Sequence, residues 1–319
     1  MRFTRGSLAR YVWVVLDARC LSFGLALALS AAALGLAFAN ASATVEAEEY
    51  SAYSDPEKPA LSFILSEEQN IEEFQKEFAI SDGEVEEVLA AVREENEALA
   101  RAYAESERVV EANEGLPDEE VKERIAASDY EEEVKKAVAQ TKSTIKGLLP
   151  KERRSDLAPW VDAQWQQESA EFQAAADKTF EAASARDIRC RVFATQYHGY
   201  TRYEVALPHK KLKFDGGFRV RLRRGDHRAR APVKEVGPWN LRDNYWQRRK
   251  YRDMWDDLPR CKPEAQAAYF NNYNGGRDQF GRKVLNPAGV DLTPRVARNL
   301  GLRKYQNAWV YVRYPWVRR

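Results

Sequence analysis

Cysteine, histidine and methionine are scarce in this sequence of 319 residues, with three, three and two copies. The first 186 residues contain no metal-ligand spacing, no glycine-rich phosphate loop and no nucleophile motif. These absences argue against a zinc site, a nucleotide-binding loop or a nucleophilic triad in that half of the chain. We therefore expect neither a cofactor nor a metal.

Net charge is also small, at +1, but the value hides a division. Residues 1–186 carry 20 Lys and Arg against 37 Asp and Glu, whereas residues 187–319 carry 30 against 12. The many carboxylates of the first half are typical of solvated helix faces. Two arrangements stay open: the acidic half forms a spacer or an arm that binds a protein partner, or it folds back on the basic half.

The longest apolar run, residues 21–39, lies near the amino terminus behind four arginines. The small residues that follow, ending at Ala43, suit cleavage of a secretory signal peptide over residues 1–43. The alternative is an uncleaved membrane anchor at residues 21–39, because about 20 apolar residues span a bilayer. Cys20 precedes the apolar run, which argues against lipoprotein processing. Both interpretations predict an extracytoplasmic chain, either secreted or associated with the cell envelope.

Cys190 and Cys261 are the two cysteines that remain after removal of a signal peptide. In an oxidising compartment an even pair within one domain favours a disulfide. Two buried free thiols are the alternative, because spacing alone cannot show that the geometry fits.

Helical periodicity dominates the acidic region, residues 61–186, which follows a polar linker at 44–60. Ser81 and Glu84 form a capping-box pattern, and apolar residues then recur every three or four positions as far as Val110. Further helices are predicted at 118–146 and at about 159–185. This region is predicted to be a helical hairpin or a small bundle.

Alternating patterns typical of strands begin near residue 188. They cover residues 190–197, 203–207, 218–223, 233–236 and 308–314. The long insertion at 240–283 interrupts them, and a connection of that length is expected to be ordered or functional. Its aromatic side chains form either the core of the insertion or a binding surface.

Asp291 lies in the run 287–294, where Val290 and Leu292 suit the end of a buried strand. Thr293 followed by Pro294 predicts the start of a helix with a side-chain cap from Thr293. A carboxylate is therefore expected at a strand-to-helix junction. It either performs chemistry there or satisfies backbone donors at the helix start.

Ordered landmarks in the second half resemble those of the rare lipoprotein A domain. They are Ala206-Leu207-Pro208-His209, Phe218-Arg219-Val220, Val233-Lys234-Glu235-Val236-Gly237-Pro238-Trp239, Gly289-Val290-Asp291-Leu292-Thr293 and Leu300-Gly301-Leu302. The resemblance covers roughly residues 188–316. It implies an α+β chain whose basic domain, residues 187–319, is a six-stranded double-psi β-barrel related to those of expansins and barrel-type endoglucanases.

The resemblance also implies roles for three residues. Asp291 is the acid/base, Glu235 a stabiliser or second carboxylate, and His209 a substrate-positioning group. Two departures from the family pattern stand out: Glu235 replaces an Asp, and Val236 replaces an Arg. On the residues alone, Glu235 can equally be the ion-pair partner of a neighbouring Arg, and His209 an ordinary turn histidine.

The function implied is that of an exported, cell-wall-active enzyme resembling a lytic transglycosylase that cleaves peptidoglycan glycan strands. Such an enzyme needs a carboxylic acid to protonate the leaving oxygen. The alternative is a non-catalytic, expansin-like module that binds peptidoglycan or another wall polysaccharide. The aromatic residues expected to stack on sugar rings are Trp239, Tyr245, Trp246 and Trp255. Nucleic acid is not expected as a partner, because it is poorly matched to an exported protein.

Overall fold

The structure, a computed structural model, describes residues 50–182, 188–212, 217–304 and 306–317, and only the backbone of residues 171–182. The predicted signal peptide or anchor at residues 1–43 lies outside the described residues. Within the described part of the chain, no helix is both long enough and apolar enough to span a bilayer. Residues 51–319 form one compact unit.

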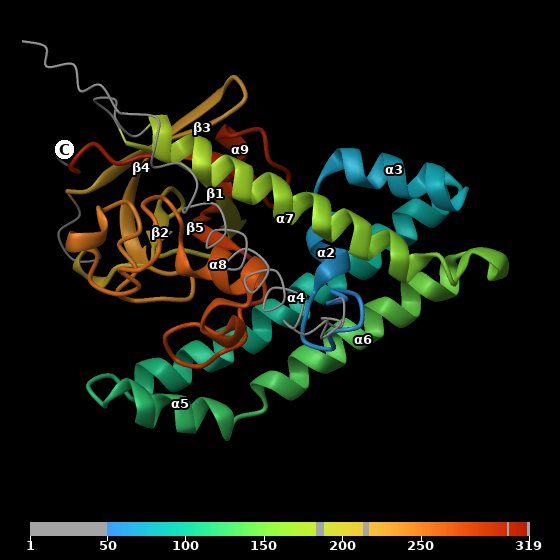
Figure 1. Cartoon of the computed structure of the whole chain (residues 1–319), viewed down its shortest axis with the longest axis horizontal. Coiled ribbons are helices and arrows are strands. Elements are labelled where there is room, and N and C mark those ends of the chain that lie inside the picture. Colours follow the sequence, from blue (N-terminus) through green and yellow to red (C-terminus); the bar gives the residue numbers. More distant parts are fainter. Residues whose placement is uncertain (1–49, 183–187, 213–216, 305, 318–319) are drawn as a thin grey trace, which may run out of the picture. The chain divides into compact units, whose positions relative to one another are not determined.

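Helices fill the first half of the described chain (Figure 1). They are α2 (Ala60–Ile64), α3 (Glu68–Phe78), α4 (Asp82–Ala112), α5 (Asp118–Ala126), α6 (Tyr130–Leu148), η1 (Lys151–Arg153) and α7 (Leu157–Ala182). The capping box is confirmed: Ser81 Oγ accepts from the Glu84 backbone N–H, and the Glu84 carboxylate accepts from the Ser81 N–H. Helices α2 and α3 were not predicted individually, although the region at 61–186 was predicted to be helical; α2 is only five residues long.

Six strands close into a barrel in the second half, as predicted. They are β1 (Arg189–Gln196), β2 (Val205–Leu207), β3 (Arg219–Arg224), β4 (His227–Val236), β5 (Ala288–Leu292) and β6 (Ala308–Arg313), in the closed order β1-β5-β2-β4-β3-β6. The pairs β1–β5 and β2–β4 are parallel, and the remaining pairs are antiparallel. The mixed helix and sheet class is thus confirmed.

Alternate residues of each strand point into the barrel and form its core. Val192 and Ala194 of β1 meet Val290 and Leu292 of β5 in this inner core. Trp246 and Tyr314 stack against each other in the same cluster, with ring centroids 5.0 Å apart.

An apolar patch also lies on the outer face of the barrel, where Phe193 of β1 meets Trp309 of β6, and helices cover it. Phe193 points outward from β1, and its ring lies 5.3 Å from that of Phe63 in α2. Phe63 also contacts Trp165 of α7 and Phe270 of α8 (Glu264–Asn271), and all four belong to one buried cluster. The helices and the barrel therefore share a core, so the helical region folds back on the barrel instead of forming a separate arm.

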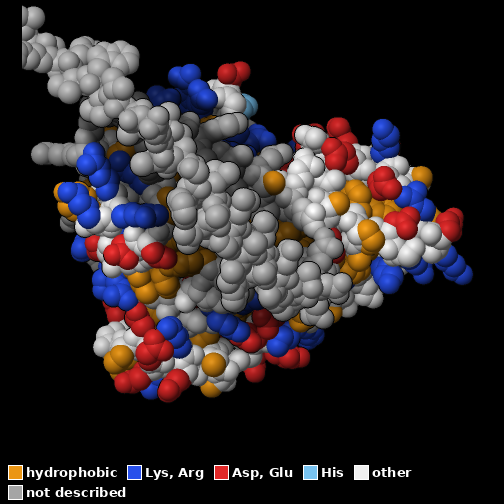
Figure 2. All heavy atoms as spheres, viewed as in Figure 1, with side chains coloured by type: hydrophobic (Ala, Val, Ile, Leu, Met, Phe, Trp, Pro, Cys, Tyr) orange, Lys and Arg blue, Asp and Glu red, His pale blue; other side chains and the backbone are white. Residues whose placement is uncertain are grey.

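Ion pairs between the acidic helices and the insertion reinforce this contact. Arg282 bonds Glu107 of α4, Arg277 bonds Glu131 of α6, and Arg242 bonds Asp118 of α5. On the face shown in Figure 2, Lys and Arg side chains gather over strands β3 and β4, whereas both signs of charge are mixed over the helices.

Residues 51–60, predicted as the end of a polar linker, are instead packed into the compact unit. Ser51 Oγ donates to the Asp162 carboxylate over 2.7 Å, and the Tyr53 N–H donates to the same group over 3.0 Å. Lys58 is buried, with its ammonium over the Tyr269 ring and 2.8 Å from the Tyr269 carbonyl oxygen. Side-chain hydrogen bonds thus order a segment whose polar composition resembles that of a linker.

The insertion at 240–283 is ordered and contains η3 (Arg249–Tyr251), α8 and η4 (Tyr273–Gly276). The disulfide prediction is confirmed: Cys190 of β1 and Cys261 of the insertion are bonded, with Cα atoms 5.0 Å apart. The bridge fastens the insertion to the first barrel strand.

The predicted helix after Asp291 is present as α9 (Pro294–Asn299), but the predicted side-chain cap is wrong. Thr293 Oγ1 donates to the Glu204 carbonyl oxygen and accepts from the Glu204 N–H, both over 3.0 Å. The hydroxyl therefore joins β5 to the chain entering β2 instead of capping the helix.

Candidate functional site

A row of side chains crosses four adjacent strands on the outer face of the barrel. Thr195 of β1 is in register with Asp291 of β5, Asp291 with Ala206 of β2, and Ala206 with Glu235 of β4. Residues in register on neighbouring strands present their side chains on the same face. Ala206 leaves open space between the two carboxylates, whose Cα atoms lie about 10 Å apart because neighbouring strands are separated by about 4.8 Å.

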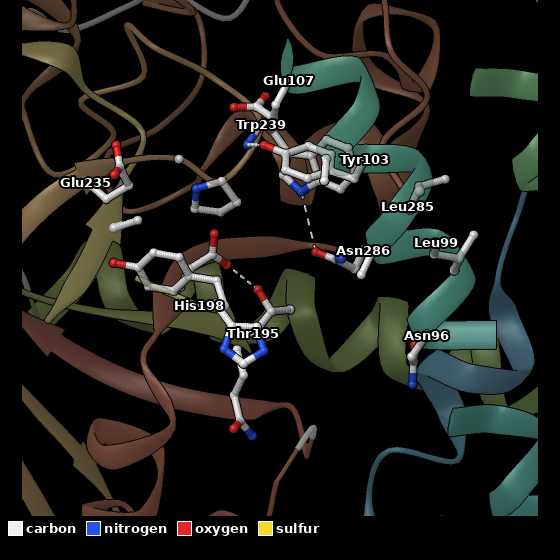
Figure 3. A pocket seen from close by; sticks show the side chains of 18 of the residues that line it. Asn96, Leu99, Tyr103, Glu107, Thr195, His198, Glu235, Trp239, Leu285 and Asn286 are labelled. Atoms are coloured by element: carbon white, nitrogen blue, oxygen red, sulfur yellow. Dashed lines mark hydrogen bonds between the residues drawn. The ribbon is translucent and has the colours of Figure 1, made fainter. Parts of the chain in front are cut away.

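Helix α4 faces this row and completes a cleft with a volume of about 780 Å³ (Figure 3). Asn96, Leu99, Tyr103 and Glu107 line it from successive turns of α4. Residues three and four positions apart share one face of a helix. These four residues continue the buried face of α4. Asn96, Tyr103 and Glu107 thus supply an amide, a phenol and a carboxylate to the cleft.

Asp291 is the carboxylate at the centre of the row. Its carboxylate accepts from the Thr195 hydroxyl. Burial raises the pKa of Asp291 from its ordinary value of 3.8 to about 7; the negative charge of Glu107 adds to this rise, and the Thr195 hydrogen bond opposes it. A carboxyl group with this pKa is partly protonated near neutral pH, and its hydrogen bond is to the Thr195 side chain.

Gly237 brings backbone close to the same carboxylate. Its φ of +134° lies in the region that favours glycine, and a Cβ built there would sit 3.8 Å from Asp291 Oδ2. Glycine at this position therefore keeps the side of the cleft beside Asp291 open.

Tyr197 and Glu204 form a second polar pair beside the row. The Tyr197 hydroxyl donates to Glu204 Oε1 over 3.3 Å, and Glu204 also accepts from the Thr201 N–H over 3.0 Å. Burial and the negative charges of Glu204, Asp291 and Glu235 raise the pKa of Tyr197, so its phenol stays protonated. Neither residue was a predicted site residue, although Tyr197 follows β1 two positions after Thr195 and so continues the same outward alternation.

Tyr103 and Trp239 join the helix to the barrel wall at the back of the cleft. The Trp239 N–H donates to the Tyr103 hydroxyl oxygen over 3.1 Å, and the rings meet edge to face with centroids 4.8 Å apart. Trp239 Nε1 donates to Asn286 Oδ1 over 3.4 Å. Burial, together with the charges of Glu107 and Asp291, raises the pKa of Tyr103, which remains a neutral hydroxyl.

Arg282, also missed from the sequence, supports this wall from behind. It is fully buried, donates to Asp278 Oδ2 over 2.6 Å and to the Trp239 carbonyl oxygen over 2.6 Å, and bonds Glu107. A single guanidinium thus fixes both the loop that carries Trp239 and the helix that carries Glu107.

The predicted residues are only partly brought together. Asp291, Glu235 and Trp239 all line the cleft, although Trp239 is largely buried. His209 does not line it: it is buried beneath the insertion, where Nε2 lies 3.0 Å from Asp253 Oδ2. Burial lowers the pKa of His209, so the ring is neutral near pH 7 and has a structural contact in place of the expected substrate-positioning one.

The aromatic residues of the insertion do not form a sugar-binding surface in the cleft. Tyr245 and Trp246 belong to the inner core, and the Tyr245 hydroxyl donates to the Gly289 carbonyl oxygen over 2.8 Å. Trp255 packs edge to face on Tyr273, away from the cleft lining. Tyr245 and Trp246 therefore lie buried in the core and not on an open surface that could stack on sugars.

The described part of the chain contains no candidate metal-binding site. No group of three or more His, Cys, Asp and Glu side chains there is arranged to hold a metal ion. The chemistry open to the cleft is proton transfer and hydrogen bonding by carboxyl, phenol and amide groups.

The fold and the cleft together describe one kind of protein. It is a closed six-stranded β-barrel with a carboxylic acid on its outer wall, beneath a helical layer. Residues 188–313 match the model of a family described as "Domain of unknown function (DUF8814)". The match spans the barrel and its insertion, from the residue before β1 to the end of β6. No curated protein and no solved structure matches the chain.

Proposed function

We propose that this chain is an exported, cell-wall-active enzyme that cleaves peptidoglycan glycan strands in the manner of a lytic transglycosylase. The proposal includes the finer fold assignment, a double-psi barrel similar to that of the rare lipoprotein A domain. The two parallel pairs, β1–β5 and β2–β4, within an otherwise antiparallel closed barrel support that assignment.

One observation carries the functional proposal. Asp291 opens onto a cleft of about 780 Å³, and its pKa of about 7 leaves the carboxyl partly protonated at neutral pH. General acids work best when their pKa lies near the operating pH. A carboxyl group held only for structure would gain nothing from this environment, since burial without a cationic partner destabilises its ionised form.

In the proposed reaction Asp291 donates its proton to the glycosidic oxygen as the bond between that oxygen and the anomeric carbon breaks. The electron pair of the broken bond stays with the leaving oxygen. The ionised Asp291 then accepts a proton from a hydroxyl of the same sugar, whose oxygen bonds the anomeric carbon and closes an internal ring. Atoms and charge balance without water, and one carboxyl group serves as acid and then as base.

Glu235 is the proposed stabiliser of positive charge on the sugar ring. Its place one strand beyond Ala206 leaves room for a sugar between the two carboxyl groups. Inverting hydrolysis is the related possibility, because carboxyl groups about 6.5 to 9.5 Å apart can hold a water between them. The two reactions differ in their products. Hydrolysis leaves a product with a reducing end, whereas the transglycosylase product ends in the internal ring and has no reducing end.

The second candidate is a non-catalytic, expansin-like module that binds wall polysaccharide. The composition of the cleft favours it: Tyr103, Tyr197 and Tyr200 supply rings, and Asn96 and Asn286 supply amides, which suit hydrogen bonding and stacking to sugars without bond cleavage. Glu235 in place of the family's Asp also fits this candidate.

The deciding experiment incubates the purified full chain with peptidoglycan sacculi and measures both released glycan fragments and co-sedimented protein. We expect release by the parent, and a reduction of about a hundredfold or more for Asp291→Asn with co-sedimentation unchanged. Glu111→Gln, at another carboxylate lining the cleft, is the matched control and should release fragments at the parent rate.

Mass analysis of the fragments separates the two reactions. An internal ring in the products supports the transglycosylase, and a reducing end supports hydrolysis. Sedimentation without release would favour the binding module, and parent-rate release by folded Asp291→Asn would remove Asp291 from catalysis.

A further inference from the structure

An arginine face lies on the outer wall of β4, β3, β6 and β1, away from the cleft. We define it by Arg189, Arg191, Arg221, Arg223, Arg228, Arg230, Tyr311 and Arg313. Their register aligns them in two rows: Arg230, Arg221, Arg313 and Arg189 in one, and Arg228, Arg223, Tyr311 and Arg191 in the next. Each row crosses four strands and is about 14 Å long, because neighbouring strands lie about 4.8 Å apart.

The alternate residues of these strands show which way the arginines point. Val220 and Leu222 of β3, and Ala229 and Ala231 of β4, are all buried in the inner core. The intervening residues must therefore face outward, and Arg221, Arg223, Arg228 and Arg230 are all exposed.

The centre of the arginine face, on β3 and β4, gathers like charges against one another. Arg221 lies directly opposite Arg230, and Arg223 directly opposite Arg228, in an antiparallel pair where opposed like charges destabilise. No ion pair between described residues involves these four side chains. Two described acids lie at the margins of the arginine face: Asp226 is in the turn between β3 and β4, and the half-buried Glu67 carboxyl interacts with Arg224 and Arg191.

We propose that the arginine face binds a linear phosphodiester polymer that lacks stacking bases, laid across the strands along the rows. Arginine presents a planar fork that matches phosphate oxygens, and repeated cations in line suit a repeating anion. This binding is separate from the cleft and does not depend on glycan cleavage.

Two other polyanionic partners fit less well. Proteins that bind single-stranded nucleic acid supply several aromatic platforms, whereas Tyr311 is the only exposed Phe, Trp or Tyr on these four strands, all of whose residues are described. An anionic bilayer usually receives apolar side chains as well as cations, and the aliphatic residues of these strands point into the barrel.

The test measures binding of the full chain to fluorescent poly(glycerol phosphate) by anisotropy across a range of salt concentrations. The variant Arg221→Gln/Arg223→Gln/Arg228→Gln/Arg230→Gln removes four cations and also two like-charge pairs, so its fold should not be weakened. The plot of log Kobs against log salt should become shallower by about 3, as expected for four lost phosphate contacts on a single-stranded polyanion.

The control variant Arg93→Gln/Arg124→Gln/Lys136→Gln/Lys146→Gln removes the same charge from exposed positions on α4, α5 and α6 and should keep the parent slope. Asp291→Asn should also bind as the parent does. Equal slopes in the arginine-face variant and the control would overturn the proposal. So would tighter binding, at matched phosphate concentration, to an oligodeoxythymidylate or to phosphatidylglycerol vesicles.

Discussion

Arg282 and Glu107 tie the insertion to helix α4 at the edge of the cleft, through an ion pair whose guanidinium is fully buried. The same guanidinium bonds Asp278, whose carboxylate is buried as well. Buried ion pairs add little net stability, yet removing one partner is costly because the other is left charged and desolvated. The cleft therefore depends on a residue that does not line it.

Arg282→Met should destabilise the protein by about 3 to 5 kcal/mol, because Asp278 and Glu107 lose their cation. Urea unfolding followed by fluorescence measures this loss. Arg277→Gln is the matched control in the same insertion: its pair with Glu131 is about one-third exposed on both sides, and its loss should cost less than about 1 kcal/mol.

A second variant separates the loss of packing from the loss of charge compensation. Adding Asp278→Asn to Arg282→Met removes the uncompensated carboxylate and should recover part of the stability. A double variant less stable than Arg282→Met alone would contradict the assignment of the loss to an unpaired buried charge.

Glu107→Gln should lower the pKa of Asp291, because the negative charge of Glu107 helps to raise it. The glutamine keeps an oxygen that can accept from Arg282, so the wall of the cleft should stay in place. NMR titration of the Asp291 carboxyl carbon measures the shift directly. Glu111→Gln removes a carboxylate one turn further along α4. An equal shift of the Asp291 pKa in that variant would mean that the pKa responds to negative charge in general and not to Glu107.

Asp291 should also make stability depend on pH. Its folded pKa of about 7 lies above the ordinary 3.8, so between these values the folded state holds a proton that the unfolded state has lost. The contribution of Asp291 to stability is therefore greatest below about pH 4, falls as pH rises to about 7, and levels off above that. The fall attributable to this group is on the order of 4 kcal/mol, since each pKa unit corresponds to about 1.4 kcal/mol.

Asp291→Asn should remove this fall, so the variant should gain on the parent as pH rises from 4 to 8. Urea unfolding of both proteins across that range gives the difference. Asp226→Asn, at the exposed turn after β3, serves as the control and should track the parent. If the difference in unfolding free energy between Asp291→Asn and the parent stayed constant from pH 4 to 8, the raised pKa of Asp291 would be ruled out.

The strands and the position of Asp291 could be predicted from the sequence because they rest on local patterns. Alternation located five of the six strands, although β4 begins six residues earlier than predicted, in a stretch where arginines alternate with small residues. The run around Gly289 and Asp291 predicted the strand and the following helix for the same reason.

Contacts between distant segments could not be predicted in this way. Tyr103 belongs to the apolar seam of α4, and its periodicity gives no indication that its hydroxyl meets the backbone of Trp239. Tyr245 and Trp246 lie among arginines, as exposed aromatic residues often do, and only the closed barrel shows that they fill its core. The charge division predicted that fold-back was possible, but not that Phe193 on the outer face of β1 packs against the helices.

The isolated barrel, residues 187–319, should therefore not fold as a soluble unit. Removing the helices would expose Phe193, Trp239 and Phe270, which are at most 8% exposed in the whole chain, and would leave Arg282 without Glu107. An apolar patch of several aromatic rings is an aggregation hazard. We expect the fragment to bind a hydrophobic dye strongly and to lose the cooperative unfolding transition of the full chain.

Mixing the fragment with separately produced residues 51–186 should restore part of that transition, because the partner surfaces are then present again. A fragment that is monomeric, unfolds cooperatively and keeps the parent's melting temperature would show that the shared core is dispensable, and the helices would then be the separable arm that composition alone allows.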